Sequence, residues 1–146
     1  MTNATLSIAI VVSEFNHEIT TELMNGCQQT LLKQGVPANQ IHIIKVPGAI
    51  EIPLILQKLA QTKKYNALIA LGAVIRGETT HYDYVCDQVS QGCQRVMLDH
   101  DIPVIFGILT TENDEQAFAR IGGHHGHKGV DAAEAALRMI QIIQTL

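Results

Sequence analysis

The sequence has no tryptophan, and aromatic residues make up only 4% of its 146 residues. Lysine and arginine total 10 against 14 aspartate and glutamate residues, which gives a net charge of −4. Without a basic, aromatic-rich surface, we expect no binding of nucleic acid. Apolar runs such as 6–12 are too short to span a bilayer, so we expect no membrane segment. No basic region precedes an apolar one at the N-terminus, so we expect no signal peptide.

Two common nucleotide-binding motifs are also missing. The sequence has no GxGxxG after its first expected strand and no Walker-type GKS or GKT. Binding of dinucleotides and of nucleoside triphosphates therefore loses its usual support. Cysteine is scarce, and Cys27, Cys86 and Cys93 lack the spacing of metal ligands. We interpret them as reduced thiols of a cytoplasmic protein, without a disulfide framework.

What is present indicates one globular domain over residues 1–146, because 47% of the residues are hydrophobic and 16% are charged. Strands and helices alternate along the chain. The expected strands cover 6–13, 41–46, 67–74 and 104–109, and the expected helices cover 18–33, 53–62, 82–99 and about 130 to the end. A short helix ending near Arg120 has Thr111, Asn113 or Asp114 as its candidate cap, and a glycine-rich loop follows over 122–129.

Nearly continuous apolar strands that alternate with helices predict a parallel sheet with both faces covered. The expected fold is therefore α/β, a three-layer α/β/α sandwich around a four-stranded parallel sheet. In such sheets, ligands bind beyond the carboxyl ends of the strands. The loops expected at that edge cover 14–16, 47–51, 76–81 and 109–113.

The most informative segment is 70–85, where a strand passes through a short polar loop into a helix. The free N–H groups of a helical first turn and the helix dipole favour an anion such as phosphate. His81 stands beside this expected anion site, where an imidazole can transfer protons near neutral pH. A solvated loop histidine is the competing interpretation.

Other candidates each have a structural alternative. Phe15 is either a local hydrophobic plug or a ring that stacks on a planar ligand. Glu51 is either a carboxylate favoured by a helix dipole or a ligand contact. Arg120 and Lys128 either cap helix carbonyls or bring positive charge to a ligand.

Three histidines, His124, His125 and His127, invite a metal interpretation. Adjacent histidines do not easily converge on one ion, and no acidic or thiolate partner accompanies them in the sequence. We therefore expect no metal site there.

Several motifs together resemble 6,7-dimethyl-8-ribityllumazine synthase, an enzyme family of riboflavin biosynthesis. The match covers nearly the whole chain in order, and the motifs that carry it are Phe15-Asn16, 47–53, 70–85, 102–111 and Arg120 with Lys128-Gly129. The resemblance implies a flavodoxin-like fold. It also implies condensation of 5-amino-6-(D-ribitylamino)uracil with 3,4-dihydroxy-2-butanone 4-phosphate, with release of phosphate and water and without a metal or cofactor.

Carried over by position, the resemblance assigns the residues that bind the pyrimidine. Phe15 would stack on the pyrimidine ring, and Ala49 and Glu51 would hold the ribityl chain. Main-chain groups of Val74 and Ile75 would bind the edge of the pyrimidine.

The resemblance also assigns the residues that bind phosphate. Gly77, Glu78 and Thr79 would face it through N–H and hydroxyl groups, and Arg120 would pair with it. A planar guanidinium suits this pairing because it matches two phosphate oxygens at once.

The remaining assignments concern protons and neighbouring subunits. His81 would move protons, and Lys128 would lie near the butanone carbonyl and the phosphate. Phe106 would reach the site of an adjoining subunit in a homopentamer, and in some family members such rings form a sixty-subunit shell. The last expected helix has only a narrow polar stripe, so it must bury more than one side.

Three positions depart from the common family pattern: Glu14 replaces an arginine, and His124 and His127 replace a lysine and an asparagine.

Two other functions stay open. One is a catalytically silent protein that binds lumazine or flavin on the same scaffold. The other is a flavodoxin-like or receiver-like signalling module, although 14–16 offers neither an acidic pocket nor a phosphate loop.

Overall fold

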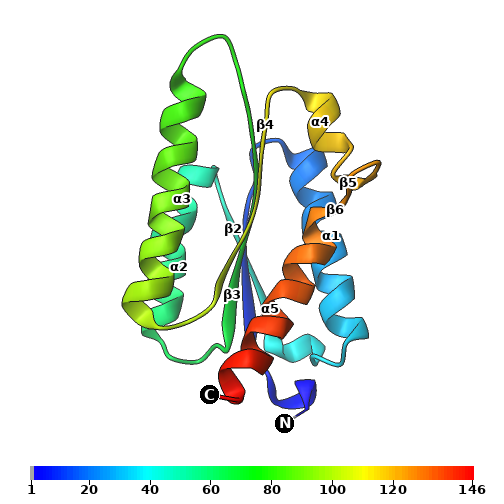
Figure 1. Cartoon of the computed structure of the whole chain (residues 1–146), viewed down its shortest axis with the longest axis vertical. Helices are drawn as coiled ribbons and strands as arrows, with labels where there is room; N and C mark the ends of the chain where they lie inside the picture. The colour runs from blue at the N-terminus through cyan, green and yellow to red at the C-terminus, as the bar shows by residue number, and fades with distance from the viewer. Residues whose placement is uncertain (1) are drawn as a thin grey trace.

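The computed structural model describes residues 2–146, and its centre is one parallel sheet with the strand order β2-β1-β3-β4. The strands are β1 (Ile8–Ser13), β2 (Ile41–Val46), β3 (Ala67–Ile75) and β4 (Val104–Thr111). Figure 1 shows α1 (His17–Lys33) and α5 (Lys128–Gln144) on one face, and α2 (Ile52–Gln61) and α3 (His81–His100) on the other. The predicted three-layer α/β/α sandwich is confirmed.

The two inner strands explain why this sheet needs helices on both faces. Every residue of β1 is buried, and so are the first seven residues of β3. Alternate side chains enter two separate clusters: Ile8 and Ile10 pack with α1 and α5, whereas Ala9 and Val11 pack with α2 and α3. A strand buried on both sides is apolar at every position, as the sequence is here.

The boundaries of three strands differ from those expected, and the smallest difference is that β3 ends at Ile75, one residue beyond the predicted 74. β1 begins at Ile8, two residues later than predicted, and β4 continues to Thr111, two residues beyond the predicted 109. The extension of β4 follows from pairing, because Thr110 and Thr111 align with Val74 and Ile75 of β3. Two polar threonines are not recognisable as strand from hydrophobicity alone.

The segment after β4 contains more regular structure than the sequence predicted. Asn113 is the cap of α4 (Asp114–Phe118), since its side chain accepts a hydrogen bond of 2.9 Å from the Gln116 N–H. The expected glycine-rich loop is instead a small antiparallel hairpin of β5 (Ile121–Gly123) and β6 (Gly126–His127). Gly122 and Gly126 permit it with φ angles of 109° and 76°, which favour glycine.

The chain places all four strand ends at one end of the molecule. In Figure 1 the loops that follow the strands lie at the top, and both termini lie at the bottom.

The three cysteines are free thiols, and burial raises the pKa of Cys27 and Cys93 to about 12. Across residues 2–146, no helix combines the length and apolarity needed to cross a membrane.

Candidate active site

A pocket of about 320 Å³ opens where β1 and β3 end, against the N-terminus of α3. It is lined by most of the residues singled out in the sequence: Phe15, Ala49, Glu51, Val74, Ile75, Gly77, Thr79 and His81. Glu78 belongs to the same loop as Gly77 and Thr79 but does not line the pocket. We call this cavity the strand-end pocket.

Phe15 enters the pocket wall from the turn after β1. Its side chain is 71% exposed, so the ring is not a buried plug and its face is open to a ligand. The next residue, Asn16, adopts the left-handed conformation (φ 62°), which asparagine tolerates better than most residues. Its side-chain amide donates a 2.9 Å hydrogen bond to the Ala73 carbonyl and thereby ties the end of β1 to that of β3.

Glu51 lies at the last position of a 3-10 turn, η3 (Ala49–Glu51), directly before α2. A Cβ atom at Gly48 would lie 3.1 Å from Oε1 of Glu51, so the glycine leaves room for the carboxylate. The carboxylate sits at a helix N-terminus and also lines the pocket, so the geometry is compatible with both interpretations of Glu51, and its ligand contact stays a prediction.

The loop from β3 to α3, where the sequence predicts an anion site, lines one side of the pocket. Thr80, the N-cap residue of α3, makes no side-chain cap hydrogen bond, and the Thr79 hydroxyl accepts a long, 3.3 Å hydrogen bond from the His81 N–H. A side chain at Gly77 would meet open space. The first turn of α3 therefore borders the pocket with the exposed His81 side chain beside it, while its His81 and Asp83 N–H groups donate to the Thr79 hydroxyl and the Thr80 carbonyl.

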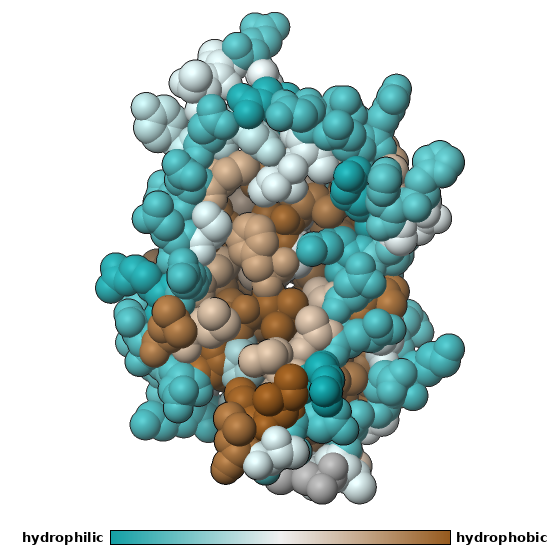
Figure 2. Space-filling view, in the orientation of Figure 1, coloured by the Kyte–Doolittle hydropathy of each residue, from teal (hydrophilic) through white to brown (hydrophobic). Residues whose placement is uncertain are grey.

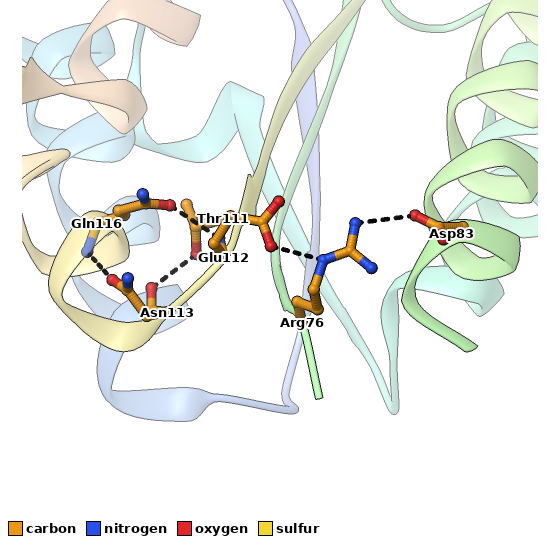
Figure 3. A network of polar contacts seen from close by, with 6 residues as sticks. All are labelled: Arg76, Asp83, Thr111, Glu112, Asn113 and Gln116. Carbon is orange, nitrogen blue, oxygen red and sulfur yellow. Dashed lines mark hydrogen bonds and ion pairs between the residues drawn. The ribbon is translucent and has the colours of Figure 1, made fainter. Parts of the chain in front are cut away.

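Two residues near this loop were not predicted as part of the site. Tyr82 lines the pocket, and the Arg76 guanidinium lies over its ring, 4.4 Å from the centroid. Arg76 also donates to Asp83 at 3.1 Å and to Glu112 at 2.5 Å, as Figure 3 shows. These two hydrogen bonds raise the pKa of Arg76, and burial is the main reason that the pKa of Tyr82 is raised.

Arg120 and Lys128 lie elsewhere, in a second cavity of about 310 Å³ beside β4. The Arg120 Nη1 donates a 2.8 Å hydrogen bond to the Gln116 carbonyl, so the predicted capping alternative is present. A guanidinium has five N–H donors, and this contact uses one of them. The Lys128 N–H donates to the Arg120 carbonyl at 2.8 Å, which keeps the two residues together.

Phe106 lines neither cavity. It is half-buried on β4 and packs against the core cluster on the α2 and α3 side. A single chain therefore brings the strand-end pocket together but leaves Phe106, Arg120 and Lys128 outside it.

The histidine-rich hairpin has a structural explanation. Nδ1 of His127 accepts hydrogen bonds from the Gly129 and Val130 N–H groups at 3.1 and 3.2 Å, which makes His127 the N-cap of α5. Its ring packs on Gly26 of α1, where a Cβ would lie 2.2 Å from the ring. Among residues 2–146, no three His, Cys, Asp or Glu side chains form a group that could hold a metal ion.

Comparison with known proteins extends these observations. Residues 5–144 match the family model of 6,7-dimethyl-8-ribityllumazine synthase. Two proteins of that name from strains of Coxiella burnetii are 55% identical over 146 residues, covering 100% of this chain and 97% of each relative. The same enzyme from a third strain is 54% identical over the same span.

Proposed function

Because the chain belongs to the 6,7-dimethyl-8-ribityllumazine synthase family, we propose that the strand-end pocket is where it carries out the family's condensation. The chain is a transferase that joins 5-amino-6-(D-ribitylamino)uracil to 3,4-dihydroxy-2-butanone 4-phosphate. Family membership confirms the resemblance found in the sequence. The observation that carries the site assignment is that an open aromatic ring, a helix N-terminus and a histidine line one pocket.

The pyrimidine belongs on the β1 side of the pocket. The open Phe15 ring offers a face on which a planar pyrimidine stacks. Ala49 and Glu51 lie where a ribityl chain would pass, with the carboxylate accepting hydrogen bonds from its hydroxyl groups. Val74 and Ile75, the last residues of β3, offer main-chain groups to the edge of the pyrimidine.

The phosphate belongs at the N-terminus of α3. Gly77 and Thr79, which line the pocket, and Glu78 between them would offer it main-chain N–H groups and one hydroxyl, and the helix dipole would add attraction. The amine attacks the ketone and water leaves as an imine forms; phosphate then leaves, and the ribitylamino nitrogen attacks the remaining carbonyl, which loses a second water as the ring closes. These steps need protons moved more than they need a strong nucleophile, and His81 is the group we assign to that task.

A second copy of the chain would complete the site. The strand-end pocket and the cavity holding Arg120 and Lys128 are different surfaces, so a contact between them is head-to-tail, the kind of contact that forms a ring when its rotation closes. Phe106, Arg120 and Lys128 of one subunit would then serve the pocket of its neighbour. Because the family resemblance implies a ring of five, we propose a homopentamer, with the sixty-subunit shell of some family members as the further level of assembly to be tested.

The surface around β4 supports this assembly. β4 is an edge strand of the sheet, and Figure 2 shows an apolar area over it, between α3 and α5, with a hydrophilic rim. On α5, Ala135, Met139 and Ile143 are exposed at a spacing of four, beside the buried face of the same helix. An open strand edge and an apolar patch are both features that self-association covers.

The free thiols support the proposed cytoplasmic location.

Incubation of the purified protein with both substrates, followed by lumazine absorbance, tests the reaction. Absence of product would leave a catalytically silent ligand-binding protein as the function, which lumazine fluorescence titration would then detect.

Co-expression of His81→Ala and Arg120→Ala chains tests the shared site. Each variant alone is expected to be nearly inactive. Random mixing in a ring restores both wild-type groups in roughly a quarter of the sites, one half times one half. Mixtures no more active than the separate variants would mean that each chain uses its own arginine. Sedimentation of the native protein measures the assembly, and an active monomer would contradict it.

A further inference from the structure

We propose that Arg76 is a positioning residue for the condensation, because it ties the first turn of α3 and the Tyr82 wall of the pocket to the end of β4. This inference rests on the proposed function of the strand-end pocket. It concerns a residue that does not itself line that pocket.

Arg76 is held from three directions at the point where β3 ends. Its main-chain N–H donates to the Thr111 carbonyl of β4 at 2.9 Å, which continues the pairing of the two strands. Its Nη2 reaches Asp83 in the first turn of α3 at 3.1 Å, and its Nε reaches Glu112 after β4 at 2.5 Å. The guanidinium plane also lies over the Tyr82 ring. One side chain thus links three elements that meet at the pocket.

The contacts continue from Glu112 toward the second cavity. The side-chain carbonyl of Gln116 accepts from the Glu112 N–H at 2.8 Å, and the Gln116 main-chain N–H donates to Asn113 at 2.9 Å, as drawn in Figure 3. The Gln116 carbonyl in turn accepts from Arg120 at 2.8 Å. A continuous series of polar contacts therefore runs from Asp83 through Arg76 to Arg120.

Stability does not explain this arrangement. The side chains of Arg76, Asp83 and Glu112 are 35%, 55% and 57% exposed, and exposed ion pairs contribute little to folding because water screens them. A planar guanidinium that bridges two carboxylates and stacks on a ring has few other orientations left. The consequence is geometric: Tyr82 and the turn that carries His81 are kept in place relative to β4.

Kinetics of Arg76→Met, measured with the assembled enzyme, test this role. Methionine keeps an unbranched apolar side chain but cannot bridge the carboxylates. We expect kcat to fall by about 10- to 100-fold, the effect of misplacing reacting groups by roughly 1 Å. KM for the pyrimidine should change much less, because Phe15, Ala49 and Glu51 are held by other contacts. Arg76→Lys should recover activity only in part, since an ammonium lacks the fork geometry.

Arg95→Met is the matched control. Arg95 lies on α3 too and forms an exposed ion pair with Asp99 at 3.6 Å, away from the strand-end pocket. It should leave kcat and KM unchanged and alter the thermal midpoint about as much as Arg76→Met does. Equal kinetics for the two variants would overturn the proposal, and so would a loss of activity in Arg76→Met that follows a loss of thermal stability.

A double variant, Asp83→Ala with Glu112→Ala, removes both acceptors of the Arg76 guanidinium while keeping the arginine. If Arg76→Met does not fold, this double variant replaces it, and we expect the same fall in kcat. A normal kcat in the double variant would also overturn the proposal. Assays of the wild-type protein distinguish this inference from the proposed function. If the wild-type protein forms no lumazine, the proposed function is wrong. If the wild type is active and the variants have the same kcat, only the proposed role of Arg76 is wrong.

Discussion

The two regions assigned to the reaction are built in different ways. The strand-end pocket stands on the ends of β1 and β3, whose residues are almost all buried. The region that we call the cation segment, residues 113–128, lies beside the edge strand β4 and consists of one short helix and a small hairpin. The pocket is positioned by the sheet, whereas the cation segment is positioned by local contacts.

The local contacts of the cation segment are helix caps and close glycine contacts. Asn113 caps α4 and His127 caps α5. A Cβ at Gly123 would lie 2.8 Å from the Cα of Ala119, and one at Gly129, directly after the segment, would lie 2.1 Å from the Leu23 carbonyl oxygen. Changes in the pocket should therefore affect chemistry alone, whereas changes in the cation segment should also affect stability.

The largest effect is expected for His81→Ala, which removes the proposed proton-transfer group from the pocket. Turnover should fall by about 10²- to 10⁴-fold while pyrimidine binding stays mostly intact. Steady-state kinetics and pyrimidine titration measure the two quantities. His100→Ala, at the other end of α3, is the control and should be active. Unchanged turnover of His81→Ala at saturating substrate would refute the assigned role.

Arg120→Ala should come next, because it removes a charge-assisted pair with the phosphate, which is worth about 1.5–3 kcal/mol. KM for the butanone phosphate should rise and most activity should be lost. Progress curves recorded at several concentrations of the butanone phosphate measure both effects. Arg120→Lys should restore activity only in part, since a point charge does not match two oxygens. If alanine is as active as arginine, the hydrogen bond to the Gln116 carbonyl is the whole role of this residue.

His127→Ala should act on stability first. It removes the N-cap of α5, which costs about 1 kcal/mol, and it also removes the ring that packs on Gly26. His127→Asn should retain most of the stability, because asparagine is among the best N-caps. Thermal unfolding measures both, with His124→Ala in the exposed hairpin turn as control. An alanine variant as stable as the control would contradict the capping role.

The smallest effect is expected for Ser13→Ala at the end of β1. The Ser13 hydroxyl is buried and has no hydrogen-bond partner among the described atoms. Removing an unpaired buried hydroxyl leaves stability unchanged or raises it by up to about 1 kcal/mol. Denaturant unfolding measures this change, and a clear loss of stability would indicate a partner that the isolated chain lacks.

Much of the strand-end pocket could be predicted from the sequence. A buried parallel sheet follows from alternating elements with apolar strands, and its topology brings the loops after β1, β2 and β3 to one edge. Phe15, Glu51 and His81 were identified because polar or aromatic residues follow apolar strands there. Their roles in binding and proton transfer stay predictions.

Local sequence determined the strands, the helices and the edge of the sheet where ligands bind, because hydrophobic periodicity and the right-handed crossover act over short stretches. Only tertiary structure decided that Arg76 reaches Glu112, 36 residues away, and that His127 packs on Gly26. It alone also separated Arg120 and Lys128 from the pocket of their own chain. These relations depend on how finished elements pack together, and no periodicity within one element encodes them.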